Sequence, residues 1–490
     1  MNQYLLRLEA VNFATTCYNT NELSTIRGGS MMLANAHELI KGTVPVELGN
    51  GPEFFGASHS VWKFDASGEE RAQQVAKDLL NALASHPTLR HGTFVCNVQQ
   101  HNVQSHEDDV RTLQKLRMLN HWGQYQKPTI ANPIVDRKNT GNSKYCEFDR
   151  IRPATQEINK GEVYQVSQST FDKRNYGREQ KKKFFRSVNE SLNVVNDLNE
   201  LTCHFDPNHR LNGKMAIIYI DGNKQSEVVY TRSIEENNQF RRFLRQSHGD
   251  FLRELVAHAL ESQCVSGESN EWFFWDTQES QHQLRIETLI WGGDDIVLVV
   301  PAWKGLFTIE RFFCASAKWK YNNEPLTHSA GIVFCNAKTP VQDMVSLADD
   351  LVIQCKKRAI NGDYKDLIAY EVLESFDNME SNIDAAWSRR MCSDSDCTYG
   401  GELVIAPSVL SSIKALIQET QKKIQEPDAR ISRRKIEMLV REMPQARKID
   451  IDFDKSISSA FDSITSWSAI GDRSERSKLL HLVSLWDYLG

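Results

Sequence analysis

Short apolar runs that end in polar turns indicate strands in the second half of the chain. Lys214–Ile220 is one such run, and Ile296–Val300 is another that directly follows two glycines and two aspartates. Runs of β-branched and apolar residues bounded by turn residues are typical of buried strands. Further strands are predicted at Leu284–Trp291, Leu326–Phe334 and Leu367–Leu373, and helices at Ile234–Glu261, Lys304–Lys318 and Val341–Arg358. This order predicts a ferredoxin-like α+β unit over residues 211–375.

The first hundred residues carry a similar mixture of patterns. Strands are predicted at Tyr4–Phe13, His59–Phe64 and Thr93–Val98, and helices at Met31–Ile40 and Glu69–Leu83. Because both units begin with a strand and share one order, a divergent duplication of a ferredoxin-like fold is a reasonable hypothesis. Gly28 and Gly29 are predicted to form a turn that opens the first helix. That turn could serve packing, or it could bind a nucleotide phosphate together with Arg27.

Two other regions have mainly helical patterns. Residues 106–210 are polar, with helices predicted at Asp108–Asn120 and Arg174–Leu198, and are interpreted as a connecting region. Residues 376–490 are predicted to be helical, with helices at Ser408–Ile424, Arg433–Arg441 and Arg476–Leu489. The chain is therefore predicted to comprise four parts: residues 1–105, 106–210, 211–375 and 376–490.

Composition narrows the class of protein only slightly. With 40% hydrophobic and 25% charged residues, the chain has the make-up of a soluble globular protein. A net charge of −6 gives no overall attraction to nucleic acid. The basic stretch Lys181–Arg186 could contact RNA, or it could be an amphipathic helix with its phenylalanines in the core.

The sequence also predicts where the protein resides. No apolar stretch approaches the ~18 residues that a membrane span needs, and the N-terminus lacks the apolar core of a signal peptide. The cysteines are scattered, and the close pair Cys392 and Cys397 lies in a polar stretch without a partner pair at zinc-site spacing. We therefore expect a cytoplasmic protein with reduced thiols and no contact with a membrane.

The candidate chemistry lies at the ends of two predicted strands. Asp221 directly follows one of them, and Asp294 and Asp295 lie at the tip of the hairpin that leads into the other. Carboxylates from two chain segments can hold two divalent cations, which stabilise both the attacking and the leaving oxygen in phosphoryl transfer. Each motif alone is also a common turn former. Together, in this order, they indicate nucleotidyl transfer.

Basic residues on two predicted helices could serve the same chemistry. Lys356 lies near the end of the helix Val341–Arg358, where a lysine can neutralise a triphosphate or simply suit the helix C-terminus. The arginines Arg241, Arg242 and Arg245 follow the first candidate strand on the next helix. They could reach a triphosphate, or they could face water.

Taken together, these segments resemble the polymerase-like large subunit of type III CRISPR effector complexes and its stand-alone relatives. They are more distantly similar to GGDEF diguanylate cyclases. The matching segments are Tyr219–Asn223, Gly292–Asp295, Thr327–Val333, Lys338–Pro340, Leu347–Lys356 and, in the first half, Ile26–Ser30. The resemblance spans residues 1–375 and implies two palm domains, the first degenerate and the second catalytic. The sequence contains no His-Asp dipeptide, so we expect a form without the HD nuclease and no DNA cleavage.

In that family the second palm makes cyclic oligoadenylates from ATP. The resemblance implies that two Mg²⁺ or Mn²⁺ ions are held by Asp221, Asp294 and Asp295. It implies that the nucleotide is contacted by Gly222, Asn223, Gly292, Gly293, Ser329 and Lys356. ATP or other nucleoside triphosphates are the implied substrates, and RNA and other effector subunits the implied partners. Ring closure would use two sites or two chains, which makes a homo-oligomer a candidate assembly.

Two alternatives remain at the level of sequence. One is a catalytically silent scaffold that binds RNA or partner proteins, and the other is a template-free polymerase that makes a linear product. The intact Asp221, Asp294 and Asp295 favour catalysis, because a decayed palm commonly loses its acids first. The sequence does not distinguish cyclic from linear products.

Overall fold

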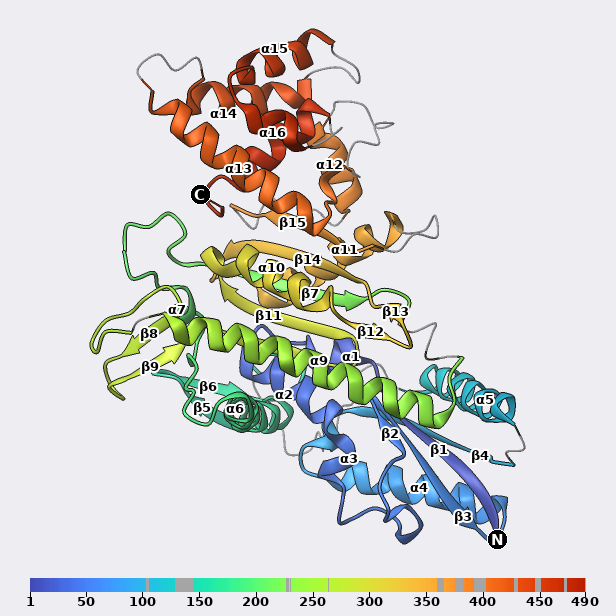
Figure 1. Cartoon of the computed structure of the whole chain (residues 1–490). Helices are drawn as coiled ribbons and strands as arrows, with labels where there is room; N and C mark the ends of the chain where they lie inside the picture. The colour runs from blue at the N-terminus through green and yellow to red at the C-terminus, as the bar shows by residue number, and fades with distance from the viewer. Residues whose placement is uncertain are drawn as a thin grey trace.

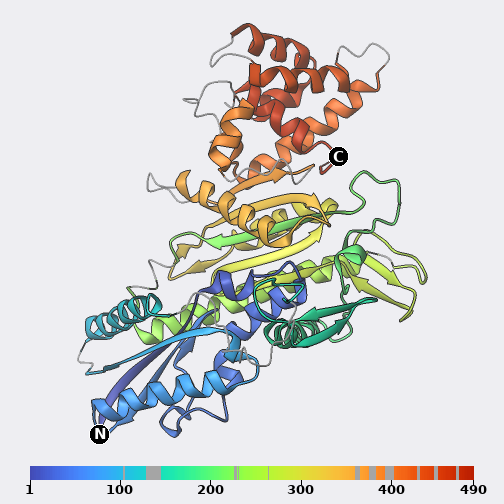
Figure 2. The ribbon, with the colours of Figure 1, turned by 180° about the vertical axis from the view of Figure 1, so that it is seen from behind.

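The computed structural model describes residues 1–489 apart from 103–104, 128–144, 226–228, 230, 263, 359–364, 375–381, 392–401, 427–430, 446–450 and 471–473. Cys392 and Cys397 lie outside the described residues. Two mainly antiparallel sheets lie on either side of the long helix α9 (Ile234–Glu261). The C-terminal helices lie beyond the second sheet, at the end of the molecule away from the first sheet (Figure 1, and from behind in Figure 2). The described helices include none that is both long and apolar enough to cross a membrane.

The first sheet has the strand order β2-β3-β1-β4, with antiparallel pairing throughout. Its strands are β1 (Asn2–Val11), β2 (Phe54–Phe55), β3 (His59–Ala66) and β4 (Thr93–Gln100). Alternate residues of β1 face opposite sides, so Leu6 packs with α4 (Glu69–Ser85) and Leu5 packs with α5 (His106–Gln124). The sheet is therefore covered by a helix on each face.

The second sheet has the order β10-β11-β7-β14-β15. Its strands are β7 (Lys214–Gly222), β10 (Glu287–Gly292), β11 (Asp295–Pro301), β14 (His328–Asn336) and β15 (Leu367–Val372). Only β14 and β15 pair in parallel. The first four strands repeat the order of the first sheet, with α9 and α10 (Gly305–Ser316) as their connections. This is the βαββαβ order of a ferredoxin-like unit, as the sequence predicts.

Helix α11 (Val341–Arg358) lies against β14 and β7 of the second sheet. Its close approach depends on Gly331 of β14, because a Cβ there would overlap the carbonyl oxygen of Ala348. Apolar residues at helical spacing, among them Val345, Ala348 and Val352, are buried. The helix is thereby fixed over the sheet face on which the candidate acids lie.

The predicted turn at Gly28 and Gly29 is wrong. Both glycines lie in the middle of α2 (Leu23–Ala34), which crosses α6 (Gln168–Val188) at very close range. A Cβ on Gly28 would overlap the carbonyl of Lys173, and a Cβ on Gly177 would overlap that of Ser24. Arg27 is buried and pairs with Glu287, so this segment serves packing in the structure.

A buried charge cluster joins the second sheet to α2 and α6. Glu287 at the start of β10 forms ion pairs with Arg27 of α2 and with Lys181 of α6, the latter at 2.6 Å. All three side chains are less than one-tenth exposed. Lys181 and Phe185 therefore lie in the core, while Lys182, Lys183 and Arg186 are exposed. This agrees with an amphipathic helix at Lys181–Arg186.

Several short elements have too few residues to show a period in the sequence. These include the hairpins β5 (Gln156–Asn159) with β6 (Val163–Val166), β8 (Phe273–Asp276) with β9 (Gln281–Leu284), and β12 (Lys320–Tyr321) with β13 (Glu324–Pro325), and the helices α1 (Phe13–Cys17), α3 (Ala36–Leu39) and α7 (Leu198–Thr202). The predicted helix Arg174–Leu198 instead begins at Gln168, where the Ser167 side chain caps it, and ends at Val188.

The C-terminal helices attach to the second sheet through β15. They are α12 (Ile383–Met391), α13 (Pro407–Ile424), α14 (Arg433–Glu442), α15 (Ile451–Phe461) and α16 (Glu475–Ser484). The hydroxyl of Tyr370 in β15 lies 2.7 Å from Nδ1 of His481 in α16, and Trp387 donates a hydrogen bond to Glu371. Both contacts are buried, and the C-terminal helices share one hydrophobic core with the second sheet.

Candidate active site

The two candidate aspartates of the hairpin lie at a tight turn between β10 and β11. Gly292 pairs with Asp295 across the hairpin, which leaves Gly293 and Asp294 as the two turn residues. Gly293 has φ +66°, a conformation that glycine adopts without the steric cost that a Cβ imposes. A positive φ at the first central residue is typical of a type II′ turn. The turn holds Asp294 at its tip and begins β11 at Asp295.

Sheet register brings the third aspartate to the same place. Ile296 of β11 pairs with Ile220 of β7, so one step further along Asp295 lies opposite Asp221. Residues opposite each other on neighbouring strands project from the same face of a sheet. Tyr219 shares this face, and its hydroxyl donates a 3.4 Å hydrogen bond to Oδ1 of Asp295. The carboxylates thus come from two adjacent strands and one turn, as predicted.

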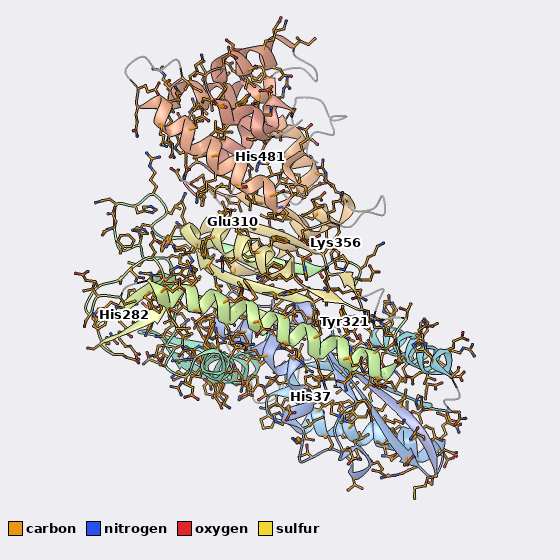
Figure 3. All side chains as sticks on the ribbon, viewed as in Figure 1. His37, His282, Glu310, Tyr321, Lys356 and His481 are labelled. Atoms are coloured by element: carbon orange, nitrogen blue, oxygen red, sulfur yellow. The ribbon has the colours of Figure 1, made fainter. Side chains whose placement is uncertain are left out.

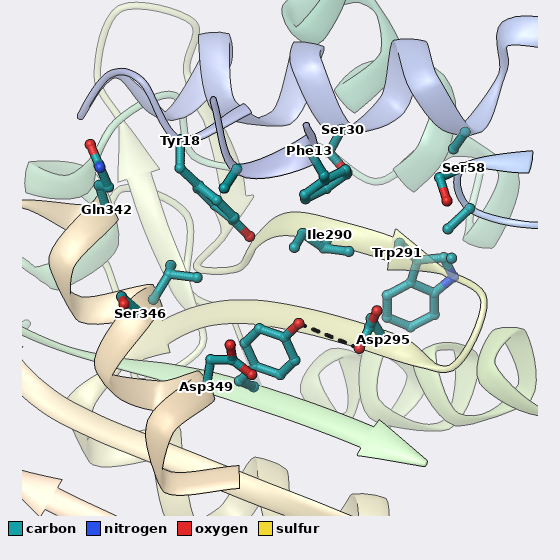
Figure 4. Close-up of a pocket in the computed structure, with 16 residues that line it drawn as sticks. Phe13, Tyr18, Ser30, Ser58, Ile290, Trp291, Asp295, Gln342, Ser346 and Asp349 are labelled. Carbon is teal, nitrogen blue, oxygen red and sulfur yellow. Dashed lines mark hydrogen bonds between the residues drawn. The ribbon is translucent and has the colours of Figure 1, made fainter. Parts of the chain in front are cut away.

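Helix α11 supplies the counter-charge. Nζ of Lys356 forms an ion pair and hydrogen bond with Oδ2 of Asp221. Figure 3 shows Lys356 near the edge of the second sheet, at the end of α11. Asp349 lies two helical turns before Lys356 on the same helix face, beside Tyr219 and Asp295 (Figure 4). Lys356 therefore provides positive charge beside a cluster of acidic groups.

A cavity of about 530 Å³ opens beside Asp295, between the helices α1 and α2 and the second sheet with α11 (Figure 4). The first half of the chain contributes Phe13, Ala14, Tyr18, Ser30, Ala34, Ala57 and Ser58 to its wall, and the second half contributes Tyr219, Ile290, Trp291, Gly292, Asp295, Gln342, Val345, Ser346 and Asp349. The Tyr18 hydroxyl is buried without a hydrogen-bond partner. The cavity has the size and the mixed lining of a small-molecule site.

Burial and mutual repulsion raise the pKa values of the acids. Burial raises the pKa of Asp221 to about 6, and the charge of Asp294 adds to the rise while Lys356 opposes it. Burial likewise raises the pKa of Asp295 well above its ordinary value, with further contributions from Asp221 and Asp294. Carboxylates that repel one another in a partly dry site gain stability from a bound cation.

The other predicted nucleotide-contacting residues have different surroundings. Gly292 and Gly293 line cavities beside the hairpin. Ser329 is fully buried and donates a 2.8 Å hydrogen bond to Oδ1 of Asn223, whose Nδ2 donates to Thr327. Gly222 packs against the Gln225 side chain. In this structure Ser329 and Asn223 brace the chain after Asp221, and nucleotide contacts by them remain a prediction.

The acids do not form a preassembled metal cage. Among the described residues, no three His, Cys, Asp or Glu side chains are arranged so that they could hold a metal ion. Lys356 lies on Asp221 where a cation would lie. The donor set nevertheless fits Mg²⁺ or Mn²⁺, which prefer carboxylate oxygens and bind through one or two of them plus substrate phosphates.

Sequence reasoning missed Asp349, Tyr219 and the contribution of the first half of the chain. Tyr219 precedes Asp221 by two residues, so strand periodicity alone places both on one face. Asp349 precedes Lys356 by seven residues, so helix periodicity does the same. The contacts of Tyr18 and Ser58 have no such signal, because they arise from the packing of segments far apart in the chain.

The strand order and the placement of the acids define a palm-type α+β domain in the second half of the chain. Residues 214–369 match the family model for the second palm domain of Cas10/Cmr2, so this part of the chain is similar to that domain. No curated protein matches the sequence.

Solved structures of Csm1 share the fold over essentially the whole chain. Csm1 of T. onnurineus aligns with 100% of this chain and 69% of its own, with a TM-score of 0.58 and 11% identity. The Csm1–Csm4 subcomplex of the type III-A CRISPR–Csm interference complex aligns with 99% and 70%, with a TM-score of 0.54 and 11% identity. The Csm1–Csm4 cassette in complex with AMPPNP gives 100% and 70%, with a TM-score of 0.54 and 10% identity. At this identity the likeness shows the fold alone.

Proposed function

We propose that this protein is a nucleotidyltransferase that joins nucleoside triphosphates, with ATP as the default, into a cyclic oligonucleotide messenger in antiviral defence. The observation that carries the proposal is the position of Asp221 and Asp295 opposite each other on one sheet face, with Asp294 at the adjoining turn, beside a cavity of about 530 Å³. The match of this segment to the second palm domain of Cas10/Cmr2 supports it. The crystal structure of a Csm1–Csm4 cassette in complex with cA3, which aligns with this chain at a TM-score of 0.53 and 11% identity, also supports it.

The proposed reaction joins a 3′-hydroxyl oxygen to an α-phosphorus, and the bond from that phosphorus to pyrophosphate breaks. Asp221, Asp294 and Asp295 would hold Mg²⁺ or Mn²⁺, which would stabilise the charge on the entering and leaving oxygens. Gly292 and Gly293 carry no side chain that would block approach of the nucleotide. The cavity wall positions the nucleotide, and positioning with charge neutralisation supplies most of the acceleration in such reactions.

Lys356 is proposed to move from Asp221 to the triphosphate when nucleotide and metal bind. Replacing Lys356 with Gln is expected to lower kcat/KM by about 10²-fold, because an ammonium on a developing phosphate charge is worth ~3 kcal/mol. The neighbouring Lys357 pairs with Asp384 away from the cavity, so Lys357→Gln is the matched control. Steady-state rates of pyrophosphate release measure both variants. Equal losses in the two would contradict a specific role for Lys356.

Metal binding is expected to raise the melting temperature by an amount that depends on pH. Folding raises the pKa of Asp221 from 3.8 to about 6, so between these values the folded state binds more protons than the unfolded state. The stability of the metal-free protein is therefore expected to fall, through this group, as pH rises from 3.8 to about 6, and to receive no further change from it at higher pH. Millimolar Mg²⁺ should raise the Tm by about 3 °C or more at pH 8 and by less at pH 5. A rise in Tm with Mg²⁺ that persists in Asp294→Ala/Asp295→Ala would mean that the metal binds elsewhere.

The alternatives predict different products. A template-free polymerase would release pyrophosphate but leave a linear product whose terminal phosphates a phosphatase removes. A silent scaffold would release no pyrophosphate from any of the four nucleoside triphosphates, even with RNA and partner subunits added. Pyrophosphate release followed by phosphatase treatment separates these cases from a cyclic product, which has no terminal phosphate.

A further inference from the structure

A second, smaller cavity of about 250 Å³ lies behind the catalytic hairpin. One wall is Gly292 and Gly293, and another is the turn Phe55–Ala57 between β2 and β3 of the first sheet. The third wall is one face of α9, which presents Arg241, Leu244, Arg245 and His248 at helical spacing. The cavity therefore lies between the two hairpins that occupy equivalent positions in the two sheets.

Arg241 is a buried cation for which the described residues provide no ion-pair partner. Its residue is 9% exposed, and its Nε is buried with no hydrogen-bond acceptor. Among the described residues, no carboxylate forms an ion pair with Arg241 or with Arg245. Burial of an unpaired guanidinium costs free energy, and such groups are normally paired. Arg241 therefore lacks the counter-ion that its environment requires.

Neighbouring groups hold both guanidinium groups in place and increase the positive charge. Arg241 lies over the ring of Phe54 at 5.6 Å, and Arg245 over that of Phe55 at 4.2 Å. A Cβ on Gly56 would overlap Nη1 of Arg241, so this glycine leaves the space that the guanidinium fills. Burial first, and then the charges of Arg7, Arg117 and Arg245, lower the pKa of Arg241 to about 10.

The negative charge of Asp294 favours the protonated form of Arg241 and so opposes the fall of its pKa. His248, on the same wall, is buried with Nε2 unpartnered, and burial lowers its pKa to about 4, so it is neutral at physiological pH. A neutral imidazole N–H and two guanidinium groups are hydrogen-bond donors. The wall thus offers donors and positive charge to an anion that reaches past the turn bearing Asp294.

We infer that this cavity binds the polyphosphate chain of the nucleotide substrate, with Arg241 and Arg245 as its anchors. The inference rests on the proposed function, because the catalytic turn forms a wall shared with the metal-binding acids. Guanidinium groups match phosphate oxygens in charge and geometry. The two residues hold the chain through its non-bridging oxygens and position the nucleotide relative to Asp294.

Inorganic tripolyphosphate is the probe, because it binds without undergoing nucleotidyl transfer. Isothermal titration of the full chain, without divalent metal, is expected to show binding that Arg241→Gln weakens at least 10-fold and Arg245→Gln at least 3-fold. Arg242 is the adjacent, exposed residue and does not line the cavity, so Arg242→Gln is the control and should bind within twofold of wild type. Gly56→Ala retains every charge but displaces Nη1 of Arg241, and should also weaken binding.

Thermal stability separates a ligand-binding arginine from a structural one. If Arg241 is kept for a ligand, Arg241→Gln should melt at the same temperature as wild type or higher, because an unpaired buried charge is removed. Equal tripolyphosphate binding by Arg241→Gln and wild type would overturn the inference. So would equal weakening by Arg242→Gln. If tripolyphosphate binding depends on Arg241 but the protein forms no nucleotide product, the anion site is supported and the proposed function is contradicted.

The source of the polyphosphate follows from a second assay. Wild type and Arg241→Gln are compared with a linear dinucleotide acceptor that carries either a 5′-triphosphate or a 5′-monophosphate. If the loss of activity in Arg241→Gln disappears with the monophosphate acceptor, the cavity binds the acceptor nucleotide. If the loss of activity persists, the cavity binds the nucleotide that loses pyrophosphate. A variant that is as active as wild type with both acceptors would overturn the inference.

Discussion

Replacement of Asp295 by Asn is expected to lower nucleotidyl transfer by about 10³-fold or more without lowering stability. Asp295 begins β11 opposite Asp221, and a metal ligand lost from such a site removes several kcal/mol of transition-state stabilisation. The same carboxylate is buried beside Asp221 and Asp294, which raise its pKa well above the ordinary value. Amide substitution retains the shape and removes that repulsion.

In Asp295→Asn the turnover rate should therefore fall while the urea midpoint of unfolding rises. Turnover of nucleoside triphosphate is measured in parallel with the urea midpoint at pH 8. Asp350→Asn is a matched control, because Asp350 lies on α11 but does not line the cavity. A variant with lowered activity and a clearly lowered urea midpoint would indicate that Asp295 acts through the fold rather than through the reaction.

Replacement of Glu287 by Gln is expected to cost about 3–5 kcal/mol of the free energy of unfolding. Glu287 lies between Arg27 and Lys181, and removal of one partner leaves buried charges without compensation. Burial alone would raise the pKa of Glu287, yet Arg27 and Lys181 hold it below its ordinary value of 4.5. A depressed pKa contributes stability above pH 4.5, and this contribution is lost as pH falls through the folded-state value.

Urea denaturation of Glu287→Gln and wild type at pH 7.5 and pH 4 measures this effect. The difference between the two proteins should be large at pH 7.5 and smaller at pH 4, where the wild-type carboxylate begins to protonate. Glu254 is exposed on α9, so Glu254→Gln should change the free energy of unfolding by less than about 0.5 kcal/mol. A pH-independent loss in Glu287→Gln would point to lost packing instead of lost charge pairing.

Apart from the two-residue strand β2, the strands of both sheets could be predicted, because their residues are buried in apolar runs. Ile217, Ile218 and Ile220 are fully buried in β7, and the run Ile296–Val300 is fully buried in β11. Gly28 and Gly29 could not be placed correctly, because Gly28 packs against Lys173 and Gly177 of the distant helix α6, and Gly29 packs against Cys17 of α1. Local sequence favours a turn at paired glycines, and tertiary packing overrides that preference.

The candidate acids could be predicted because strand register alone brings them together. Asp221 and Asp295 need only the pairing of β7 with β11, and Asp294 needs only the turn. The ion pair of Lys356 with Asp221 also follows from α11 lying on that face. The pairing of Ser329 with Asn223, and the second cavity at Arg241, depend on side-chain packing that no spacing in the sequence encodes.

The most direct test of the proposed activity is to incubate the purified protein with the four nucleoside triphosphates, singly and mixed, with Mg²⁺ or Mn²⁺. Products are identified by mass spectrometry, and Asp294→Ala/Asp295→Ala serves as the control. Wild type is expected to form a product with the mass of a ring of nucleoside monophosphates, and the control is expected to form none. Folded wild-type protein that forms no such product, with cognate RNA and partner subunits also present, would contradict the proposed activity.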